Sequence, residues 1–231
     1  MKKLAIVVSS KNTNEEKADF IQHLTDTCDY PNDIMFNINP SGISLTQVYN
    51  DSVKELDADY YIFVHDDVEF VRNGWGKEVV RLFEENPDYG IIGVAGSGEF
   101  GKEAAWWRYK DIYGQVLHRK DGKSWLTTFS PLLDCDLMEV CVVDGVFLAV
   151  AKDRIKHWFD EKYEGFNFYE VSFCLKNYLD KVKIGVTTNI RLAHNSVGEL
   201  KPNWYENREK LNAEFGKYYP IKVKRYGKKY K

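Results

Sequence analysis

Residues 60–69 have the sequence YYIFVHDDVE, in which five apolar or aromatic residues lead directly into a histidine and three closely spaced carboxylates. An uninterrupted run of Tyr, Ile, Phe and Val is typical of a strand buried on both faces inside a parallel sheet. The acidic cluster follows the end of this strand, where open α/β sheets bind ligands. A divalent cation holding phosphate oxygens would relieve the repulsion between the carboxylates. The same residues also suit a surface turn with solvated acids.

The segments around this stretch predict an α/β protein. Strand-like segments at 4–8, 34–38 and 60–64 alternate with helical segments at about 15–27 and from 45 onward. Ser44 to Gln47 has the S-x-x-Q form of a capping box, which predicts the start of the second helix. The β-α-β-α-β order predicts a doubly wound, Rossmann-like sheet flanked by helices. The glycines of 90–98 lack the G-x-G-x-x-G spacing, which excludes a dinucleotide fingerprint.

The second half of the chain is less regular. The patterns predict strands at 90–96, 140–150 and 182–192. They also predict a helix from 75 to before Pro87, a helical start at 153–158, a helix that opens at Glu170 and a last helix at about 204–215. The aromatic-rich segment 100–136 is predicted to be a loop region on the substrate side. An irregular hairpin layer that serves as core is the alternative.

Composition and charge narrow the class of protein. The chain has 231 residues, 44% of them hydrophobic and 29% charged, which is typical of a soluble globular protein. The net charge of -3 argues against a nucleic-acid partner. The absence of a long apolar run, of a signal peptide and of any CxxC spacing predicts a cytoplasmic protein with reduced thiols. Residues 217–231 contain seven Lys or Arg and no acid, which suits either a membrane surface or a solvated tail.

Taken in order, these segments resemble a family-2-type glycosyltransferase of the GT-A fold, of the kind found in a small bacterial subgroup related to a streptomycin-biosynthesis protein. This fold is a Rossmann-like, doubly wound mixed sheet flanked by helices. His65-Asp66-Asp67 stands where the family has its D-x-D metal and diphosphate motif. Asn50 matches an asparagine on the helix before that strand, and Asp144-Gly145 begins a strand that resembles the one beside the acceptor site. His194 is similar to a late histidine that helps hold the metal in some relatives.

The segment from Tyr169 to Lys176 resembles the family's E-D-x-D-L-x-x-R helix start, which puts Glu170 at the position of the catalytic base. This chain departs from the pattern at several places. Ser172 and Lys176 replace an acid and an arginine, His65 replaces the first Asp of D-x-D, and the segment starting at Ser9 replaces a proline-containing turn. These departures leave an alternative, in which the chain is a relative of the same fold that binds a nucleotide sugar or a carbohydrate without catalysis.

The resemblance implies one domain, with a nucleotide-binding half (about 1–98), an acceptor and catalytic half (about 99–215) and a basic tail (216–231). It implies an inverting enzyme that moves a sugar from a nucleotide-diphosphate donor, a UDP-sugar, to a hydroxyl of a glycan or glycolipid in bacterial surface glycan synthesis. The tail would then contact the inner face of the membrane.

The resemblance also assigns roles to individual residues. Glu170 is the general base, and Mn²⁺ or Mg²⁺ is held by three side chains: Asp67, His194 and His65. The donor-binding set is Ser9, Ser10, Lys11, Asn50, His65, Asp66 and Asp67, with Arg72 as a further diphosphate contact. On the acceptor side the resemblance implies Asp144 and Gly145, and the aromatic-rich segment adds the candidates Trp106, Trp107 and Trp125.

Each of these residues also has a purely structural interpretation. Asp66 suits a turn cap, His194 a structural histidine, Glu170 an acid favoured by the helix dipole, and the tryptophans a core. Two further enzyme classes are disfavoured. A sugar-phosphate nucleotidyltransferase would carry a glycine-rich basic loop after the first strand, and 9–14 has no glycine. A metal hydrolase is not supported by any HxxxH or HxH spacing.

Overall fold

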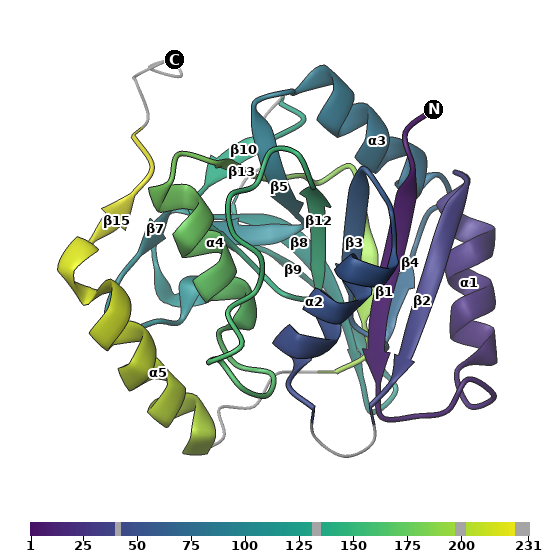
Figure 1. The fold of residues 1–231 in the computed structure, drawn as a ribbon, viewed down its shortest axis with the longest axis horizontal. Helices are drawn as coiled ribbons and strands as arrows, with labels where there is room; N and C mark the ends of the chain where they lie inside the picture. Colours follow the sequence, from purple (N-terminus) through teal and green to yellow (C-terminus); the bar gives the residue numbers. More distant parts are fainter. Residues whose placement is uncertain (40–42, 131–134, 197–201, 225–231) are drawn as a thin grey trace.

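The computed structural model describes residues 1–39, 43–130, 135–196 and 202–224. The described residues form a seven-stranded mixed sheet in the order β10-β13-β5-β12-β3-β1-β2 (Figure 1). Its strands are β1 (Leu4–Ser10), β2 (Asn32–Ile38), β3 (Tyr60–Val64), β5 (Tyr89–Gly93), β10 (Met138–Val140), β12 (Phe147–Ala151) and β13 (Lys183–Val186). Parallel pairs join β1 to β2 and β3, and β5 to β13, whereas β12 runs antiparallel to both β3 and β5. The predicted α/β class and mixed, Rossmann-like sheet are confirmed.

The apolar run at 60–64 forms β3, near the centre of this sheet. Its residues are all at most 1% exposed because β1 and β12 flank the strand and side chains cover both faces. The prediction of a doubly buried strand is therefore confirmed. One neighbour, β1, is parallel to β3 and the other, β12, is antiparallel, as a mixed sheet allows.

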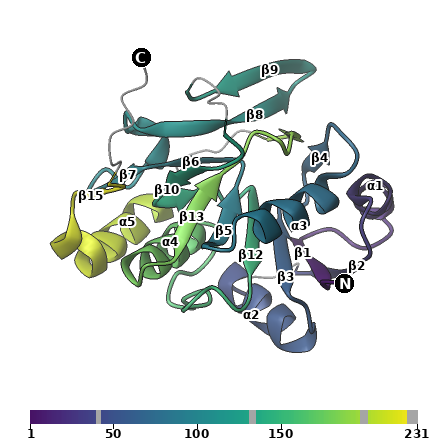
Figure 2. The same ribbon diagram turned by 90° about the horizontal axis from the view of Figure 1, so that it is seen from above.

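A second sheet lies over one face of the first. Its order is β11-β6-β8-β14-β4, with β9 paired to β8. Its strands are β4 (Val68–Phe70), β6 (Ala95–Ser97), β8 (Ile112–Lys120), β9 (Lys123–Thr128), β11 (Val142–Val143) and β14 (Leu192–His194). Figure 2 shows the β8–β9 hairpin on the opposite side of the seven-stranded sheet from α2 (Leu45–Glu55). The loop predicted over 100–136 is thus largely a hairpin layer, the alternative structure, because 112–128 pairs as two strands.

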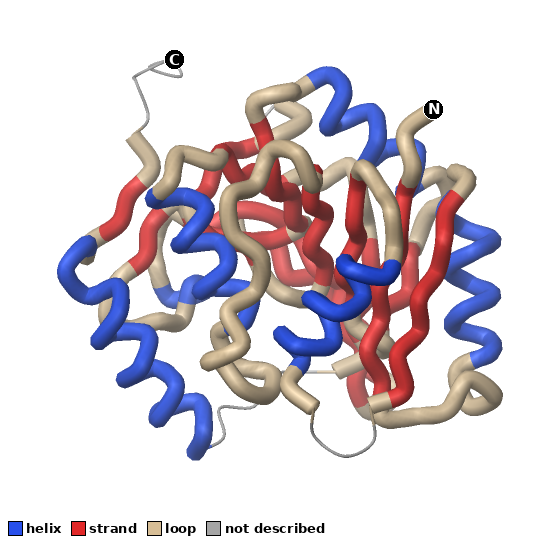
Figure 3. Tube along the Cα trace, in the orientation of Figure 1, coloured by secondary structure: helices blue, strands red, loops and turns tan. Residues whose placement is uncertain are grey.

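Helices and short strands complete the fold (Figure 3). The helices are α1 (Ala18–Cys28), α2, α3 (Trp75–Glu85), α4 (Tyr169–Leu179), α5 (Pro202–Phe215) and the 3₁₀ helices η1 (Trp106–Arg108) and η2 (Gly216–Tyr218). A two-stranded sheet pairs β7 (Glu99–Phe100) with β15 (Ile221–Lys222). Within the described residues, no helix combines the length and the hydropathy that a membrane crossing requires.

Several predicted boundaries change in the structure. The first helix begins at Ala18, because 14–17 forms a turn, and the helical start predicted at 153–158 is only a turn. The strand predicted over 182–192 divides into β13 and β14, which belong to different sheets. Ser44 does precede α2 as predicted, but its hydroxyl pairs with Thr46 Oγ1 at 2.6 Å and does not cap the helix.

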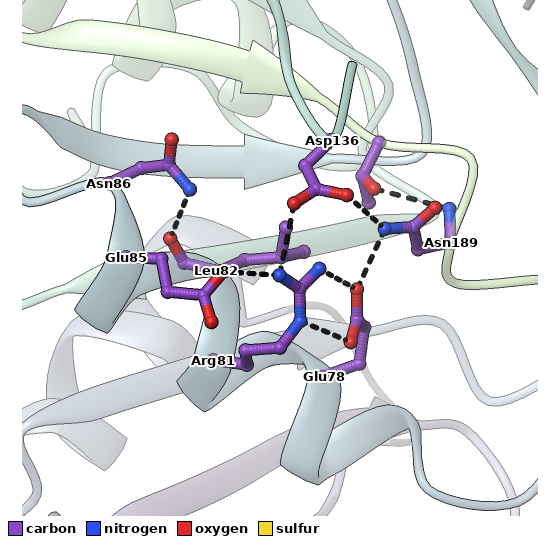
Figure 4. A network of polar contacts seen from close by, with 8 residues as sticks. Glu78, Arg81, Leu82, Glu85, Asn86, Asp136 and Asn189 are labelled. Carbon is purple, nitrogen blue, oxygen red and sulfur yellow. Dashed lines mark hydrogen bonds and ion pairs between the residues drawn. The ribbon is translucent and has the colours of Figure 1, made fainter. Parts of the chain in front are cut away.

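A polar network fixes the segment before β10 and the segment after β13 to α3 (Figure 4). Arg81 pairs with Glu78 and Glu85 on its own helix and, at 2.9 Å, with Asp136 in the segment before β10. Asn189, which follows β13, donates to both Glu78 and Asp136. These bonds hold the connection between β13 and β14 in place, and β14 in turn supplies one side chain of the site described next.

Candidate active site

Strand register brings the first group of site residues together. β1 and β3 pair in parallel with Leu4 opposite Tyr60 and Val8 opposite Val64, so both strands end at the same edge of the sheet. The hydroxyl of Ser10 donates to the Asp66 carboxylate there. Lys17, at the start of α1, donates to the Asp66 carbonyl at 2.7 Å and lies 3.4 Å from Asp66 Oδ2. No local sequence pattern marks Lys17 for this role.

The antiparallel strand β12 adds a second group at this edge. Because β12 runs opposite to β3, its first residues lie beside the last residues of β3, and His65 N donates to Val146 O at 3.3 Å. Asp144 and Gly145 immediately precede this contact, and Asp144 Oδ1 accepts from Val146 N at 2.8 Å. The Asp144-Gly145 turn is therefore held directly against His65.

The second sheet brings His194 to the same edge. His194 pairs with Val68 across β14 and β4, and this places its Nε2 3.2 Å from Asp67 Oδ1. Candidate ligand atoms of His65, Asp67 and His194 all lie within 4.8 Å of one another. No described residue donates a well-directed hydrogen bond to Asp67 Oδ1, although this oxygen is buried. A buried acceptor beside two imidazoles is a donor set that fits a divalent cation.

The charges of this trio are coupled. Burial opposes ionisation of Asp67, but contacts with His194 and Ser196 outweigh it and hold the pKa of Asp67 well below its usual range. Burial lowers the pKa of His194, but the Asp67 carboxylate raises it by more, so the net shift is upward. Burial, followed by the charge of His194, lowers the pKa of His65. The Asp67 carboxylate thus favours the charged form of His194, whereas burial disfavours the charged form of His65.

Glu170 lies in the first turn of α4, as predicted. Its Oε2 is buried, and no described residue forms a hydrogen bond with it. Burial, together with the nearby charge of Asp144, raises the pKa of Glu170 to about 8. The close approach of α4 to β12 depends on Gly145, since a Cβ at that position would lie 2.1 Å from the Tyr169 hydroxyl and 3.3 Å from Glu170 Cγ. A buried carboxyl with a raised pKa suits a proton acceptor.

A cleft of about 470 Å³ opens at this edge, and most of its lining is aromatic or imidazole. Its charged or titratable lining residues are His65, His118, Asp144, Glu170 and His194. Its large aromatic residues are Trp106, Trp107, Phe129, Phe166, Phe168 and Trp204. Trp106 is buried whereas Trp107 is 41% exposed. Of the predicted acceptor-side residues, Trp106, Trp107 and Asp144 line this cleft, and Trp125 lies outside its lining and stacks on His118 at 5.5 Å.

A second cleft, of about 780 Å³, lies beside the ends of β1 and β2. Ser9, Ser10 and Lys11 of the predicted donor-binding set line it, and Phe166 lines both clefts. Asn50 lines neither of them. Its Nδ2 donates to Phe159 O and to Glu161 Oε1, each at 2.9 Å, so it ties α2 to the loop before α4.

Arg72, the further diphosphate contact, also lies apart from these two clefts. It lines a separate cleft of about 830 Å³ beside the network of Figure 4.

Sequence reasoning missed several residues of the aromatic cleft. His118 faces His194 across the β8–β14 pairing, and Phe129, Phe168 and Trp204 come from three separate segments. No local pattern marks these residues, because only the folded arrangement of β8, α4 and α5 brings them together.

The two departures in α4 have structural partners. Ser172 is buried and donates to Tyr169 O at 3.1 Å. Lys176 pairs with Asp160 and lies 3.6 Å from Glu214 of α5. The Ser172 bond is internal to α4, whereas Lys176 fixes the helix to the loop before it and lies close to α5.

The fold and this site define a class of protein. Solved structures with similar folds are GT-A glycosyltransferases. S. aureus TarS has a TM-score of 0.58 at 12% identity over 92% of this chain, and GalNAc-T7, solved with UDP, GalNAc and Mn²⁺, has a TM-score of 0.53 at 8% identity over 90% of it. This chain spans 39% of the TarS chain and 48% of the GalNAc-T7 chain. No curated protein sequence matches it significantly.

The family model described as "Glycosyltransferase like family" matches residues 4–218. The chain belongs to this family.

Proposed function

We propose that the protein is an inverting glycosyltransferase, which moves a sugar from a nucleotide-diphosphate donor to a hydroxyl of an acceptor. One observation carries this proposal: His65 and His194 of the cation-binding trio line the same cleft as Glu170. A site for the leaving diphosphate and a proton acceptor thus share one space. Transfer requires both groups, because the diphosphate must leave as the acceptor hydroxyl loses its proton.

Asp67, His194 and His65 would hold the cation. Mixed carboxylate and imidazole ligands suit Mn²⁺ somewhat better than Mg²⁺. The GalNAc-T7 structure, which was solved with Mn²⁺, supports a divalent ion. When bound, such an ion neutralises charge that develops on the leaving diphosphate. Asp66, held by Ser10 and Lys17, keeps the segment after β3 in place.

Glu170 would take the proton of the acceptor hydroxyl. The acceptor oxygen then forms a bond to the anomeric carbon as the bond from that carbon to the diphosphate oxygen breaks, and the nucleoside diphosphate leaves. A single base on the face opposite the leaving group inverts the anomeric carbon, as in inverting glycosidases. The raised pKa of Glu170 supports this role, since a general base works best with a pKa near the working pH.

The two clefts would divide the substrates between them. The polar cleft at Ser9, Ser10 and Lys11 suits the nucleotide, for which we propose UDP. The aromatic cleft suits a glycan or glycolipid acceptor, because sugar rings pack their apolar faces on aromatic side chains. The resemblance to bacterial enzymes supports a role in surface glycan synthesis.

We further propose that the protein works in the cytoplasm, with its basic tail at the inner face of the membrane. Only the charge of residues 217–231 supports this placement, and 225–231 lies outside the described residues. Sedimentation with vesicles of anionic and of neutral lipid tests it, and equal recovery with both would contradict it.

Calorimetric titration of UDP, GDP and dTDP tests the donor site, with Mn²⁺ and with EDTA, on the native chain and on Asp67→Ala. Asp57→Ala is the matched control, because Asp57 is an exposed carboxylate paired with Lys3. Metal-dependent binding of one diphosphate that Asp67→Ala loses and Asp57→Ala retains would support the proposal. Diphosphate binding that is unchanged by EDTA and by Asp67→Ala would overturn the metal-binding role of Asp67.

Turnover separates the two functional alternatives. A Glu170→Gln chain should bind the donor as the native chain does and transfer roughly 10²–10⁴-fold more slowly. If the native chain itself binds donor but transfers no sugar to any offered acceptor, the non-catalytic binding alternative replaces the proposal.

A further inference from the structure

Tyr169 links the proton-acceptor side of the site to the cation side. It is the first residue of α4 and is 2% exposed. Its hydroxyl lies 2.9 Å from His65 Nε2 and 3.0 Å from Gly145 O. Three elements, α4, β12 and the end of β3, therefore meet at one hydroxyl group.

The hydrogen atoms at this junction can be assigned. A hydroxyl has one proton to donate, and a carbonyl oxygen can only accept. The Tyr169 hydroxyl therefore donates to Gly145 O, and the proton between Tyr169 and His65 must come from the ring Nε2. The opposite assignment would leave two oxygens 3.0 Å apart with no proton between them. A neutral His65 thus has its proton on Nε2 and its lone pair on Nδ1.

We infer that Tyr169 is a positioning residue that holds His65 in the Nε2–H tautomer, so that Nδ1 is the nitrogen offered to a cation. This inference rests on the cation site of the proposed function. A metal-binding histidine needs its other nitrogen engaged in order to fix the ring and the tautomer, and the partner that does so is commonly a carboxylate or a carbonyl. In this protein the partner of the His65 Nε2 is the Tyr169 hydroxyl, which is itself oriented by its hydrogen bond to Gly145 O.

Gly145 and the surrounding rings keep the hydroxyl at this point. A Cβ on residue 145 would lie 2.1 Å from the Tyr169 oxygen, so any larger residue there displaces the hydroxyl. The Tyr169 ring packs against Tyr49 and Phe159, with centroids 5.9 and 6.2 Å away. Tyr169→Phe therefore retains the ring packing and removes only the hydroxyl.

Two measurements on the intact protein test the inference. Long-range ¹H–¹⁵N spectra of metal-free, histidine-labelled protein report the tautomer of His65, and electron paramagnetic resonance of free Mn²⁺ reports cation affinity. We expect a pure Nε2–H pattern in the native chain, a tautomer mixture in Tyr169→Phe, and Mn²⁺ binding weakened roughly 10–100-fold by that change. Tyr163→Phe is the matched control, because its buried hydroxyl bonds Glu214 at 2.6 Å. It should leave both signals as in the native chain.

Three results would overturn the inference. These are an Nδ1–H pattern for His65 in the native chain, an unchanged tautomer in Tyr169→Phe, and unchanged Mn²⁺ affinity in that variant. Neither measurement requires turnover. A native chain that binds Mn²⁺ as expected but transfers no sugar would therefore count against the proposed function alone.

Discussion

Replacing Glu170 by glutamine should make the protein more stable in alkaline solution. Glutamine has the shape of the protonated acid and cannot ionise in the buried site. Burial raises the pKa of Glu170 from 4.5 to about 8, so between these values the folded chain holds a proton that the unfolded chain has released. The free energy of unfolding of the native chain then falls as pH rises. At about 1.4 kcal/mol per pKa unit, the native chain should lose roughly 4 kcal/mol relative to Glu170→Gln between pH 5 and pH 8.

Urea unfolding followed by tryptophan fluorescence measures this difference, in EDTA, from pH 5 to pH 9. The two chains should have similar stability at pH 5, and Glu170→Gln should be the more stable chain at pH 9. Glu164→Gln is the control for loss of one carboxylate, because Glu164 is exposed in the loop before α4. A stability difference between the native chain and Glu170→Gln that is the same at every pH would refute the reasoning that its surroundings raise the pKa of Glu170.

Three other changes have defined outcomes. Asp144→Asn removes a charge that raises the pKa of Glu170, so the pH of half-maximal kcat/KM should move downward, and an upward move would contradict the assignment. Gly145→Ala should lower the free energy of unfolding by roughly 1–3 kcal/mol through its clash with Tyr169, as denaturant unfolding would show. Asn50→Ala leaves Phe159 N and Phe159 O without their side-chain partner, so it should lower the free energy of unfolding by roughly 1–3 kcal/mol in the same measurement. Donor binding, measured by calorimetry, should be retained.

The sequence predicts the central part of the fold well because its signals there are local. An apolar run long enough for one strand and the helical spacing after Ser44 identify β3 and α2, and Asp66 and Asp67, which follow His65, lie at the edge of the sheet where the candidate site forms. Helix α4, with Glu170 in its first turn, was also predicted from local pattern.

The remaining features depend on long-range pairing. The candidate cation-binding trio of His65, Asp67 and His194 forms only because β14 belongs to the second sheet and pairs with β4. Asn50 has the type and place of a donor-binding residue in the resemblance, yet its amide is fully engaged by the loop before α4. The direction in which the Asn50 side chain points is set by its packing against that loop, and the spacing of residues in the sequence does not encode such packing.

The parallel pairing of β1 and β3 determines where this protein can change in length. The contact between Ser10 and Asp66 depends on which residues of the two strands face each other, and not on how much chain connects them. One residue added inside either strand would turn every following side chain to the opposite face and separate the two groups. Residues added between α1 and β2, or between α2 and β3, would lengthen a surface connection and leave the pairing unchanged. Both connections enter the sheet at the edge opposite the candidate site, so such insertions would leave the strand ends that carry Ser10 and Asp66 at their present spacing.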